Sequence, residues 1–364
     1  MNVCFLLGSV QKNGGIGRVT TVLSNALCTK EDLRVSMLVY LHKDLPALYT
    51  PDEKVAFDVL YTQNLSMTKA LLLKGAVKKV RAYIKAHSID VIVACGVIFY
   101  PLAILACRHT SAKCFCWEHS DPGDSSDYRF QKQSRRFASK RCAKMIVLTK
   151  AAEAYYLERY RIKKEKLVQI YNPVDAEAAK SAGYDASSKK ILSVGRLAYQ
   201  KNFDRLLDIA ARVLPQRPGW TWDIYGEGPA RGELEKKIED LALTGRVFLK
   251  GQVNDLYERY RDYAFMVMTS RYEGFPMSLI EGAVNRLPLV SFDVPTGPRE
   301  IITDGSNGFL VAKDDDETMI GRILVLTENG EMRAAMSEKA YERAASFKME
   351  DILEQWTTLL KTPG

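Results

Sequence analysis

The sequence predicts an α/β protein made of two doubly wound domains, each built on a parallel sheet. Two observations carry this prediction. At 364 residues, the chain exceeds the size at which a single hydrophobic core usually stops growing. Short apolar runs alternate with helix-like stretches, and such doubly buried strands are typical of parallel sheets. We therefore expect ligands to bind at the carboxyl ends of the strands.

The first half opens with a predicted strand, a glycine-containing loop over 8–17 and a helix over 18–27. Its apolar runs predict strands over Asn2–Leu7, 34–40, 90–95, Lys113–Trp117 and 144–149. The loop glycines and His119 each follow one of these strands. Both therefore belong at the carboxyl edge of the predicted sheet.

Residues 172–175, Asn-Pro-Val-Asp, form the predicted linker, because a residue that precedes proline is disfavoured in helical geometry. The alternation then repeats, with strands predicted over Lys190–Val194, Thr221–Tyr225, 246–250, 264–269, 287–291 and 309–311. The predicted helices of this half cover 203–214, 231–243 and 255–261, and an amphipathic helix follows over 349–360. The acidic run Asp314-Asp-Asp316 precedes a helical stretch, where acids favour the helix dipole, and we interpret it as a cap.

The composition is that of an ordinary globular protein, with 47% hydrophobic and 26% charged residues. No apolar run approaches 18 residues, so no transmembrane helix is predicted, and the first residues lack the basic region of a signal peptide. All seven cysteines precede residue 143, mostly in apolar runs, which favours reduced thiols in a cytosolic protein. Cys114 and Cys116 share a strand face without a second ligand pair, so no metal site is predicted.

Positive charge is concentrated in the first half. Residues 1–172 hold 27 Lys and Arg against 14 Asp and Glu, whereas residues 173–364 hold 25 against 30. The basic residues cluster in the amphipathic stretches 69–85 and 129–144, a pattern that favours peripheral contact with an anionic membrane. The alternative is a core-facing helix with a solvated basic face. Nucleic acid is disfavoured, because no recognisable nucleic-acid-binding motif appears.

The segment 271–281 follows an apolar strand and leads through a Gly-Phe-Pro loop into a helix that starts near Pro276 or Met277. A helix start offers unpaired backbone N–H groups and a positive dipole end, which suit an anionic ligand. Glu273 and Glu281 frame this loop, and carboxylates of this kind accept strong hydrogen bonds from sugar or ribose hydroxyls. A loop glutamate and a solvated helix glutamate remain the alternative.

Arg196 and Lys201 lie five residues apart across a loop that leads into the next helix. Arginine binds phosphate oxygens with a two-pronged fork and lysine with a point charge, so the pair can stabilise a departing phosphate without a metal. Gly15 lets the backbone approach a phosphate closely. Neither the GxGxxG nor the GxxxxGK[ST] spacing occurs, which disfavours a nicotinamide site and a P-loop.

Three segments together resemble a known family. Glu273 and Glu281 resemble the E-x7-E motif of the retaining glycosyltransferases of family 4. Residues 193–203 are similar to that family's Gly-Arg…Lys-Asn segment, and Gly14-Gly-Ile-Gly17 is similar to its Gly-Gly loop. The segments occur in the family's order, and the resemblance extends over nearly the whole chain.

The resemblance implies a GT-B fold, in which two Rossmann-like domains face each other across a central cleft. Residues 1–172, with a C-terminal helix over about 348–364, would bind the acceptor, and residues 173–347 the nucleotide sugar. The implied reaction is retaining, metal-independent transfer of a hexose or N-acetylhexosamine from a nucleotide-diphosphate sugar, with UDP as the expected carrier and no further cofactor. The expected acceptor is a membrane- or lipid-linked glycan of surface-polysaccharide or lipopolysaccharide synthesis, at the cytoplasmic face of the membrane.

The resemblance also assigns site residues. The catalytic candidates are Glu273, His119, Arg196 and Lys201. The substrate-binding candidates are Gly14, Gly15, Arg196, Lys201, Gly226, Val253, Gly274, Phe275, Met277, Glu281 and Glu300. Among them, His119 and Glu273 would lie beside the donor sugar, Glu281 would bind the ribose hydroxyls, and Val253 would lie near the base.

Two alternatives stay open. One is another GT-B enzyme, either a nucleotide-sugar epimerase, which the two spaced glutamates disfavour, or an α-glucan phosphorylase, which needs a lysine that carries pyridoxal phosphate. The other is a non-catalytic, membrane-associated scaffold of the same fold. A scaffold is expected to have lost its phosphate ligands, whereas Arg196 and Lys201 are both present.

Overall fold

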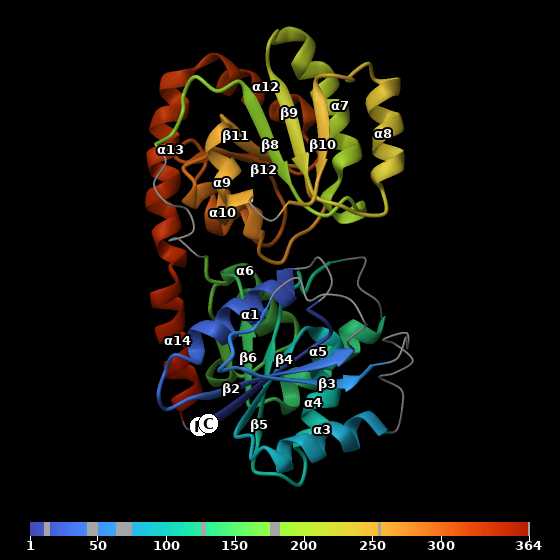
Figure 1. The fold of residues 1–364 in the computed structure, drawn as a ribbon, viewed down its shortest axis with the longest axis vertical. Helices are drawn as coiled ribbons and strands as arrows, with labels where there is room; N and C mark the ends of the chain where they lie inside the picture. The colour runs from blue at the N-terminus through green and yellow to red at the C-terminus, as the bar shows by residue number, and fades with distance from the viewer. Residues whose placement is uncertain are drawn as a thin grey trace. The chain divides into compact units, whose positions relative to one another are not determined.

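The computed structural model describes residues 1–10, 15–41, 50–62, 75–124, 129–174, 183–253 and 256–362. The chain divides into two units, one made of Met1–Pro173 with Met349–Gly364 and the other of Val174–Lys348 (Figure 1). Each unit is a parallel α/β domain with its own hydrophobic core. The predicted α/β class with two doubly wound domains is confirmed.

The first unit contains a seven-stranded parallel sheet in the order β3-β2-β1-β4-β5-β6-β7. The strands are β1 (Asn2–Leu7), β2 (Arg34–Leu41), β3 (Ala56–Tyr61), β4 (Val91–Cys95), β5 (Lys113–Trp117), β6 (Lys144–Val147) and β7 (Leu167–Gln169). The edge strands β3 and β7 were not predicted. β3 is only partly buried and β7 has three residues, so neither has the long apolar run by which the central strands are recognised.

Helices α1 (Gly15–Leu27), α3 (Gly75–Ala86), α4 (Tyr100–Cys107), α5 (Arg129–Arg141), α6 (Lys150–Arg159) and α14 (Met349–Lys361) complete this unit. α1 begins at Gly15, so the predicted loop over 8–17 was too long. A Cβ atom at Gly17 would lie 3.0 Å from the carbonyl oxygen of Ser9, and glycine there lets the first turn pack against the chain that leaves β1. On α14, the ring of Trp356 lies 4.8 Å from that of Trp117, which anchors the helix in the first unit.

The second unit contains a six-stranded parallel sheet in the order β10-β9-β8-β11-β12-β13. The strands are β8 (Lys190–Val194), β9 (Thr221–Tyr225), β10 (Val247–Gly251), β11 (Phe265–Met268), β12 (Leu289–Asp293) and β13 (Gly308–Ala312). The helices are α7 (Phe203–Val213), α8 (Arg231–Asp240), α9 (Leu256–Arg259), α10 (Met277–Val284), α11 (Pro298–Ile301), α12 (Asp316–Glu328) and α13 (Gly330–Ala344). The direction of chain progression reverses between β8 and β11, so the loops after these strands flank the point where open α/β sheets bind ligands.

The helix predicted over 231–243 was too long, because α8 ends at Asp240. The backbone of Ala242 has a φ of 54°, a left-handed conformation that cannot continue an α-helix. The amphipathic pattern extended past this point because Leu241 and Leu243 still face the apolar core of the unit.

The two basic stretches form helices that pack on the first unit's core. On α3, Ala76, Val80 and Ile84 are buried, and Arg81 donates hydrogen bonds to two carbonyls at the end of α4. Residues 69–74 of the predicted helix lie outside the described residues. The exposed basic residues of the two helices are Lys78, Lys79, Lys85, Arg129, Lys132, Arg136, Lys140 and Arg141. In the described residues, no helix is both long and apolar enough to cross a bilayer.

Candidate active site

Two loops of the second unit lie in direct backbone contact at the carboxyl edge of its sheet. The N–H of Gly195, after β8, donates to the carbonyl of Tyr225 at the end of β9 over 2.9 Å. Added Cβ atoms would lie 1.9 Å from the Gly195 oxygen at Gly226 and 2.2 Å from the Leu197 oxygen at Gly228. Gly226 also has a φ of 140°, so only glycine fits this contact without strain. Gly226, a predicted substrate-binding residue, therefore packs against the loop after β8, which carries Arg196 and Lys201, and helps to hold that loop in place.

Lys201 ends a short 3₁₀ turn, Tyr199–Lys201, and Asn202 after it adopts a left-handed φ of 58° before α7 begins. The ammonium group of Lys201 lies 2.6 Å from Oε1 of Glu273, and their side chains are only 16% and 6% exposed. The stem of Lys201 crosses the backbone at Gly195, where an added Cβ would lie 3.0 Å from it. The structure therefore brings two of the predicted catalytic residues together.

The loop that carries Glu273 is fixed to the next loop along the sheet. The Thr296 hydroxyl donates to the carbonyl oxygen of Glu273. Gly297, with a φ of 99°, lies so close to Pro276 that an added Cβ would be 2.4 Å from its ring. These contacts join the loops after β11 and β12, so the backbone around Glu273 is preorganised rather than free to move.

Gly274 and Phe275 lie between Glu273 and α10, and Met277 begins that helix. The Phe275 side chain is buried, with its ring 5.6 Å from that of Phe347, whereas Gly274 and Met277 are half-buried. Because its side chain is buried, Phe275 can contact a ligand only through its backbone. No described side chain caps the first turn of α10. The N–H of Leu279 donates to the carbonyl of Pro276 over 3.0 Å, so the N–H groups of Met277 and Ser278 are the ones without a partner among the described residues.

Glu281 lies one turn into α10 and is 3% exposed. The Tyr260 hydroxyl donates to its Oε2 over 3.0 Å. Sequence reasoning missed Tyr260, since it lies 21 residues upstream and carries no motif signal. Its hydrogen bond orients a carboxylate that solvent scarcely reaches.

Arg196, Val253 and Glu300 occupy three different loops or helices. Arg196 is exposed, and its guanidinium forms no ion pair or hydrogen bond within the described ranges, so it is available to an anion. Val253 is half-buried just after β10, and its neighbour Asn254 lies outside the described residues. Glu300 is half-buried on α11, where its carbonyl accepts a hydrogen bond from Arg343.

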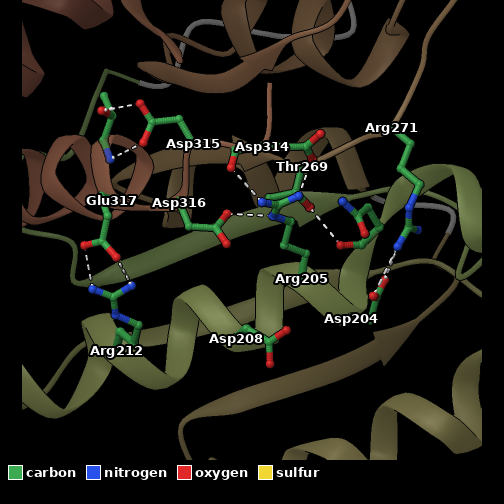
Figure 2. Close-up of polar contacts among 12 residues, drawn as sticks. Asp204, Arg205, Asp208, Arg212, Thr269, Arg271, Asp314, Asp315, Asp316 and Glu317 are labelled. Atoms are coloured by element: carbon green, nitrogen blue, oxygen red, sulfur yellow. Dashed lines mark hydrogen bonds and ion pairs between the residues drawn. The ribbon is translucent and has the colours of Figure 1, made fainter. Parts of the chain in front are cut away.

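The acidic run at 314–316 has structural partners (Figure 2). Asp315 accepts a hydrogen bond from the N–H of Thr318 over 3.0 Å and caps α12, as predicted. Arg205 on α7 pairs with both Asp314 and Asp316. The run therefore ties α12 to α7. In the part of the chain that the structure describes, no group of three or more His, Cys, Asp or Glu is placed to hold a metal.

In the first unit, His119 follows β5 and its ring lies 4.3 Å from that of Trp117. Burial lowers the pKa of His119 from 6.5 to about 4, although the adjacent Glu118 carboxylate opposes this shift. His119 is thus neutral near pH 7. Its Nε2 atom is shielded from solvent and has no hydrogen-bond partner among the described residues.

Glu118 anchors the loop on which His119 lies, a role that sequence reasoning missed. Arg135 on α5 pairs with it over 2.6 Å, the Tyr156 hydroxyl donates over 2.8 Å, and the N–H of Ser120 over 3.1 Å. Burial alone would raise the pKa of Glu118, but these partners together lower it below its ordinary value. The carboxylate is therefore charged, and it holds in place the residues directly before and after His119, namely Glu118 itself and Ser120.

Gly15 is the exposed first residue of α1, and an added Cβ there would meet no atom of the described residues within 4 Å. The structure itself therefore leaves room for a side chain at Gly15, and any steric need for glycine would come from a ligand. Gly14 lies outside the described residues.

Comparisons with known proteins follow the division into two units. A family model described as Glycosyltransferase Family 4 matches residues 13–178, and one described as Glycosyl transferases group 1 matches residues 175–343. The Erwinia amylovora amylovoran biosynthesis glycosyltransferase AmsD is 34% identical over 220 residues, which are 60% of this chain and 62% of that protein. The chain thus matches less than two thirds of that relative's length.

Two further proteins match almost end to end. A Campylobacter jejuni alpha-1,4-N-acetyl-D-galactosaminyltransferase is 25% identical over 372 residues, covering 99% of this chain and 98% of its own. The crystal structure of a Staphylococcus aureus TarM mutant has a TM-score of 0.82 at 17% identity, and the match covers 99% of this chain and 100% of that one. That likeness supports the fold, while the two family models together extend from residue 13 to residue 343. The chain therefore belongs to the family-4 glycosyltransferases of the GT-B fold.

Proposed function

We propose that this glycosyltransferase moves a hexose or N-acetylhexosamine, with retention, from a UDP-sugar to a lipid-linked or membrane-held glycan in surface-polysaccharide synthesis. The observation that carries the proposal is the Lys201–Glu273 ion pair at the carboxyl edge of the second unit's sheet. Lys201 lies on the same loop as Arg196, which is exposed and whose guanidinium has no partner among the described residues. Cations and an oriented carboxylate at this point suit a diphosphate and a sugar.

The donor's diphosphate would be held by Arg196 and Lys201. Arginine offers a bidentate fork and lysine a point charge, and both can neutralise the charge that develops on the leaving diphosphate. The N–H groups at the start of α10 add a positive dipole end. Together these groups can stabilise the leaving group without a metal ion, and we propose that the reaction is metal-independent.

The donor's sugar and ribose would be bound by the two carboxylates. Glu281, oriented by Tyr260, would accept hydrogen bonds from the ribose hydroxyls. Glu273 would stabilise positive charge on the anomeric carbon as the bond to phosphate lengthens. His119 is neutral near pH 7, so we propose that it forms a hydrogen bond with a sugar hydroxyl rather than an ion pair.

Three known proteins support the choice of donor and acceptor. The TarM crystals contain UDP and alpha-GlcNAc-glycerol. The Campylobacter enzyme is named for a GalNAc-containing acceptor on PP-undecaprenol, and the Erwinia protein for biosynthesis of amylovoran. The exposed basic residues of α3 and α5 further support peripheral contact with anionic lipid at the cytoplasmic face, each adding about 1 kcal/mol near such a surface.

A thermal-shift panel of nucleotides and nucleotide sugars tests the proposal. Binding to the folded state alone stabilises by about 2.7 kcal/mol at a hundredfold excess over Kd. We expect a shift with UDP, a larger one with one UDP-sugar, and none with the double variant Lys201→Ala/Glu281→Ala. Lys237→Ala is the matched control, because Lys237 pairs with Asp208 over 2.7 Å on the outer helices of the same unit. A wild-type protein that shifts with no nucleotide would overturn the proposal, and a shift with GDP or ADP alone would replace UDP as the carrier.

A further inference from the structure

Tyr199 is the most solvent-exposed large hydrophobic side chain in the described ranges. It is 71% exposed, whereas Phe130 and Tyr341, the next in order, are each 46% exposed. Tyr199 lies on the 3₁₀ turn that ends at Lys201. An aromatic ring this open to water, two residues from a predicted catalytic lysine, has no role in the hydrophobic core.

The ring is nevertheless held in place from one side. The Arg271 guanidinium lies 4.1 Å from the ring centroid. Arg271 is itself fixed, since its Nη1 donates to the Tyr199 carbonyl and its Nη2 lies 3.2 Å from Oδ2 of Asp204. Figure 2 shows the side chains of Arg271 and Asp204 pointing toward each other. One face of the ring is therefore covered, and no other ring or cation of the described residues stacks on it.

Backbone and side-chain hydrogen bonds join this turn to the loop that carries Glu273. The N–H of Arg271 donates to the carbonyl of Gln200 over 2.8 Å. The amide group of Gln200 donates in return to the carbonyl of Tyr272 over 3.0 Å. The Tyr199 ring is thus tied, through its neighbours in sequence, to both members of the Lys201–Glu273 pair.

The stack of tyrosine on arginine is not sufficient by itself to define a site. Tyr341 and Glu338 lie on α13, and Arg286 lies just after α10. The Arg286 guanidinium is 4.3 Å from the centroid of the Tyr341 ring and pairs with Glu338. That group likewise joins a tyrosine, an arginine and a carboxylate, here a glutamate in place of the aspartate, but no described hydrogen bond joins it to the Lys201–Glu273 pair. It therefore provides an internal control for the position of Tyr199.

We propose that the ring face of Tyr199 opposite the Arg271 guanidinium, with the adjoining Arg271–Asp204 pair, forms a subsite for a pyranose ring of the acceptor glycan. A pyranose has an apolar C–H face that packs on an aromatic ring, and tyrosine supplies a large rigid surface for it. The Arg271 and Asp204 side chains beside the ring are 25% and 53% exposed, and they offer a donor and an acceptor for the sugar's hydroxyls. This inference rests on the proposed function, because it assigns the sugar to the acceptor of that reaction. It departs from the resemblance to the family, which gives acceptor binding to residues 1–172, since Tyr199 belongs to the second unit.

Saturation-transfer NMR on the full chain, with UDP present, tests the subsite. The probes are methyl hexosides and methyl N-acetylhexosaminides. We expect at least one glycoside to receive saturation on the protons of one ring face. That signal should fall at least fivefold in Tyr199→Ala and persist in Tyr199→Phe and in the control Tyr341→Ala. An undiminished signal in Tyr199→Ala would overturn the proposal, as would a wild-type protein that saturates none of the glycosides.

A thermal shift with UDP on the same variants separates this inference from the donor site. Tyr199 is exposed, so we expect Tyr199→Ala to fold normally and to keep the UDP shift of the wild type. If the wild type shows no UDP shift but retains Tyr199-dependent saturation, the proposed donor fails and the carbohydrate subsite stands. If the UDP shift is present and saturation does not depend on Tyr199, the subsite fails and the donor site stands.

Discussion

The ammonium group of Lys201 lies 2.6 Å from a carboxylate oxygen of Glu273, although the two residues are 72 positions apart in the chain. The first follows β8 and the second follows β11, and these strands are neighbours in the sheet. The pair therefore forms because parallel strands end at one edge, and it places a cation and an anion where the donor's phosphate and sugar are proposed to meet.

Removing one member of this pair should affect stability and activity in separable ways. Lys201→Met leaves the Glu273 carboxylate nearly buried without its partner, which we expect to cost roughly 3 kcal/mol of unfolding free energy. Lys201→Met/Glu273→Gln should recover most of that stability, because both charges are removed, while transfer stays at least a hundredfold below wild type. Denaturant unfolding and transfer assays on the three proteins check this. A double variant that recovers both the unfolding free energy and the transfer activity would show that the pair is only structural.

Gly226→Ala should disrupt the contact between the loops after β8 and β9. The added Cβ would lie 1.9 Å from the Gly195 oxygen at a φ of 140°, so we expect a loss of a few kcal/mol in unfolding free energy and of the UDP shift. The matched control is Gly321→Ala within α12, where an added Cβ meets nothing within 4 Å. That change should instead stabilise the protein by about 0.5–1 kcal/mol. Thermal unfolding with and without UDP measures both, and equal effects of the two variants would contradict the steric argument.

Tyr260→Phe should weaken nucleotide binding without a change in fold. The lost hydrogen bond to a charged carboxylate is expected to raise the Kd for UDP about tenfold, equivalent to about 1.4 kcal/mol. Tyr263→Phe is the control, because the Tyr263 hydroxyl donates to Asp223 over 2.8 Å and not to Glu281. Isothermal titration calorimetry with UDP distinguishes them. Equal affinity of Tyr260→Phe and wild type would show that Glu281 needs no such orientation.

Acidification should destabilise the first unit through His119. Burial holds the pKa of His119 in the folded protein at about 4, against an ordinary value of 6.5. Between these values the unfolded chain binds a proton that the folded chain does not. His119 therefore does not reduce the free energy of unfolding above pH 6.5, and that free energy decreases as the pH falls from 6.5 toward 4.

The substitution His119→Asn removes the titrating group and should flatten the fall in melting temperature over that window. Each unit of pKa shift corresponds to about 1.4 kcal/mol, so the difference between the two proteins is measurable by calorimetry at several pH values. His109→Asn is the control, because His109 is exposed and asparagine tolerates its φ of 63°. Parallel profiles for wild type and His119→Asn would show that folding does not lower the pKa of this histidine.

The sequence by itself determined the α/β class, the two domains, most strands and several site residues, since apolar runs, glycines and motif spacings are local signals. Lys201 and Glu273 could be named in this way. Their ion pair could not, because it depends on β8 and β11 lying side by side.

Only the tertiary structure decided which groups orient the site. Tyr260 reaches Glu281 from a different helix, and Arg135 reaches Glu118 across 17 residues, without any pattern in the sequence that links them. The structure likewise shows the Arg271 guanidinium against the Tyr199 ring, although the two residues are 72 positions apart in the chain. These contacts come from packing between distant segments, and a buried charge or a supported ring becomes visible only when the elements around it are in place.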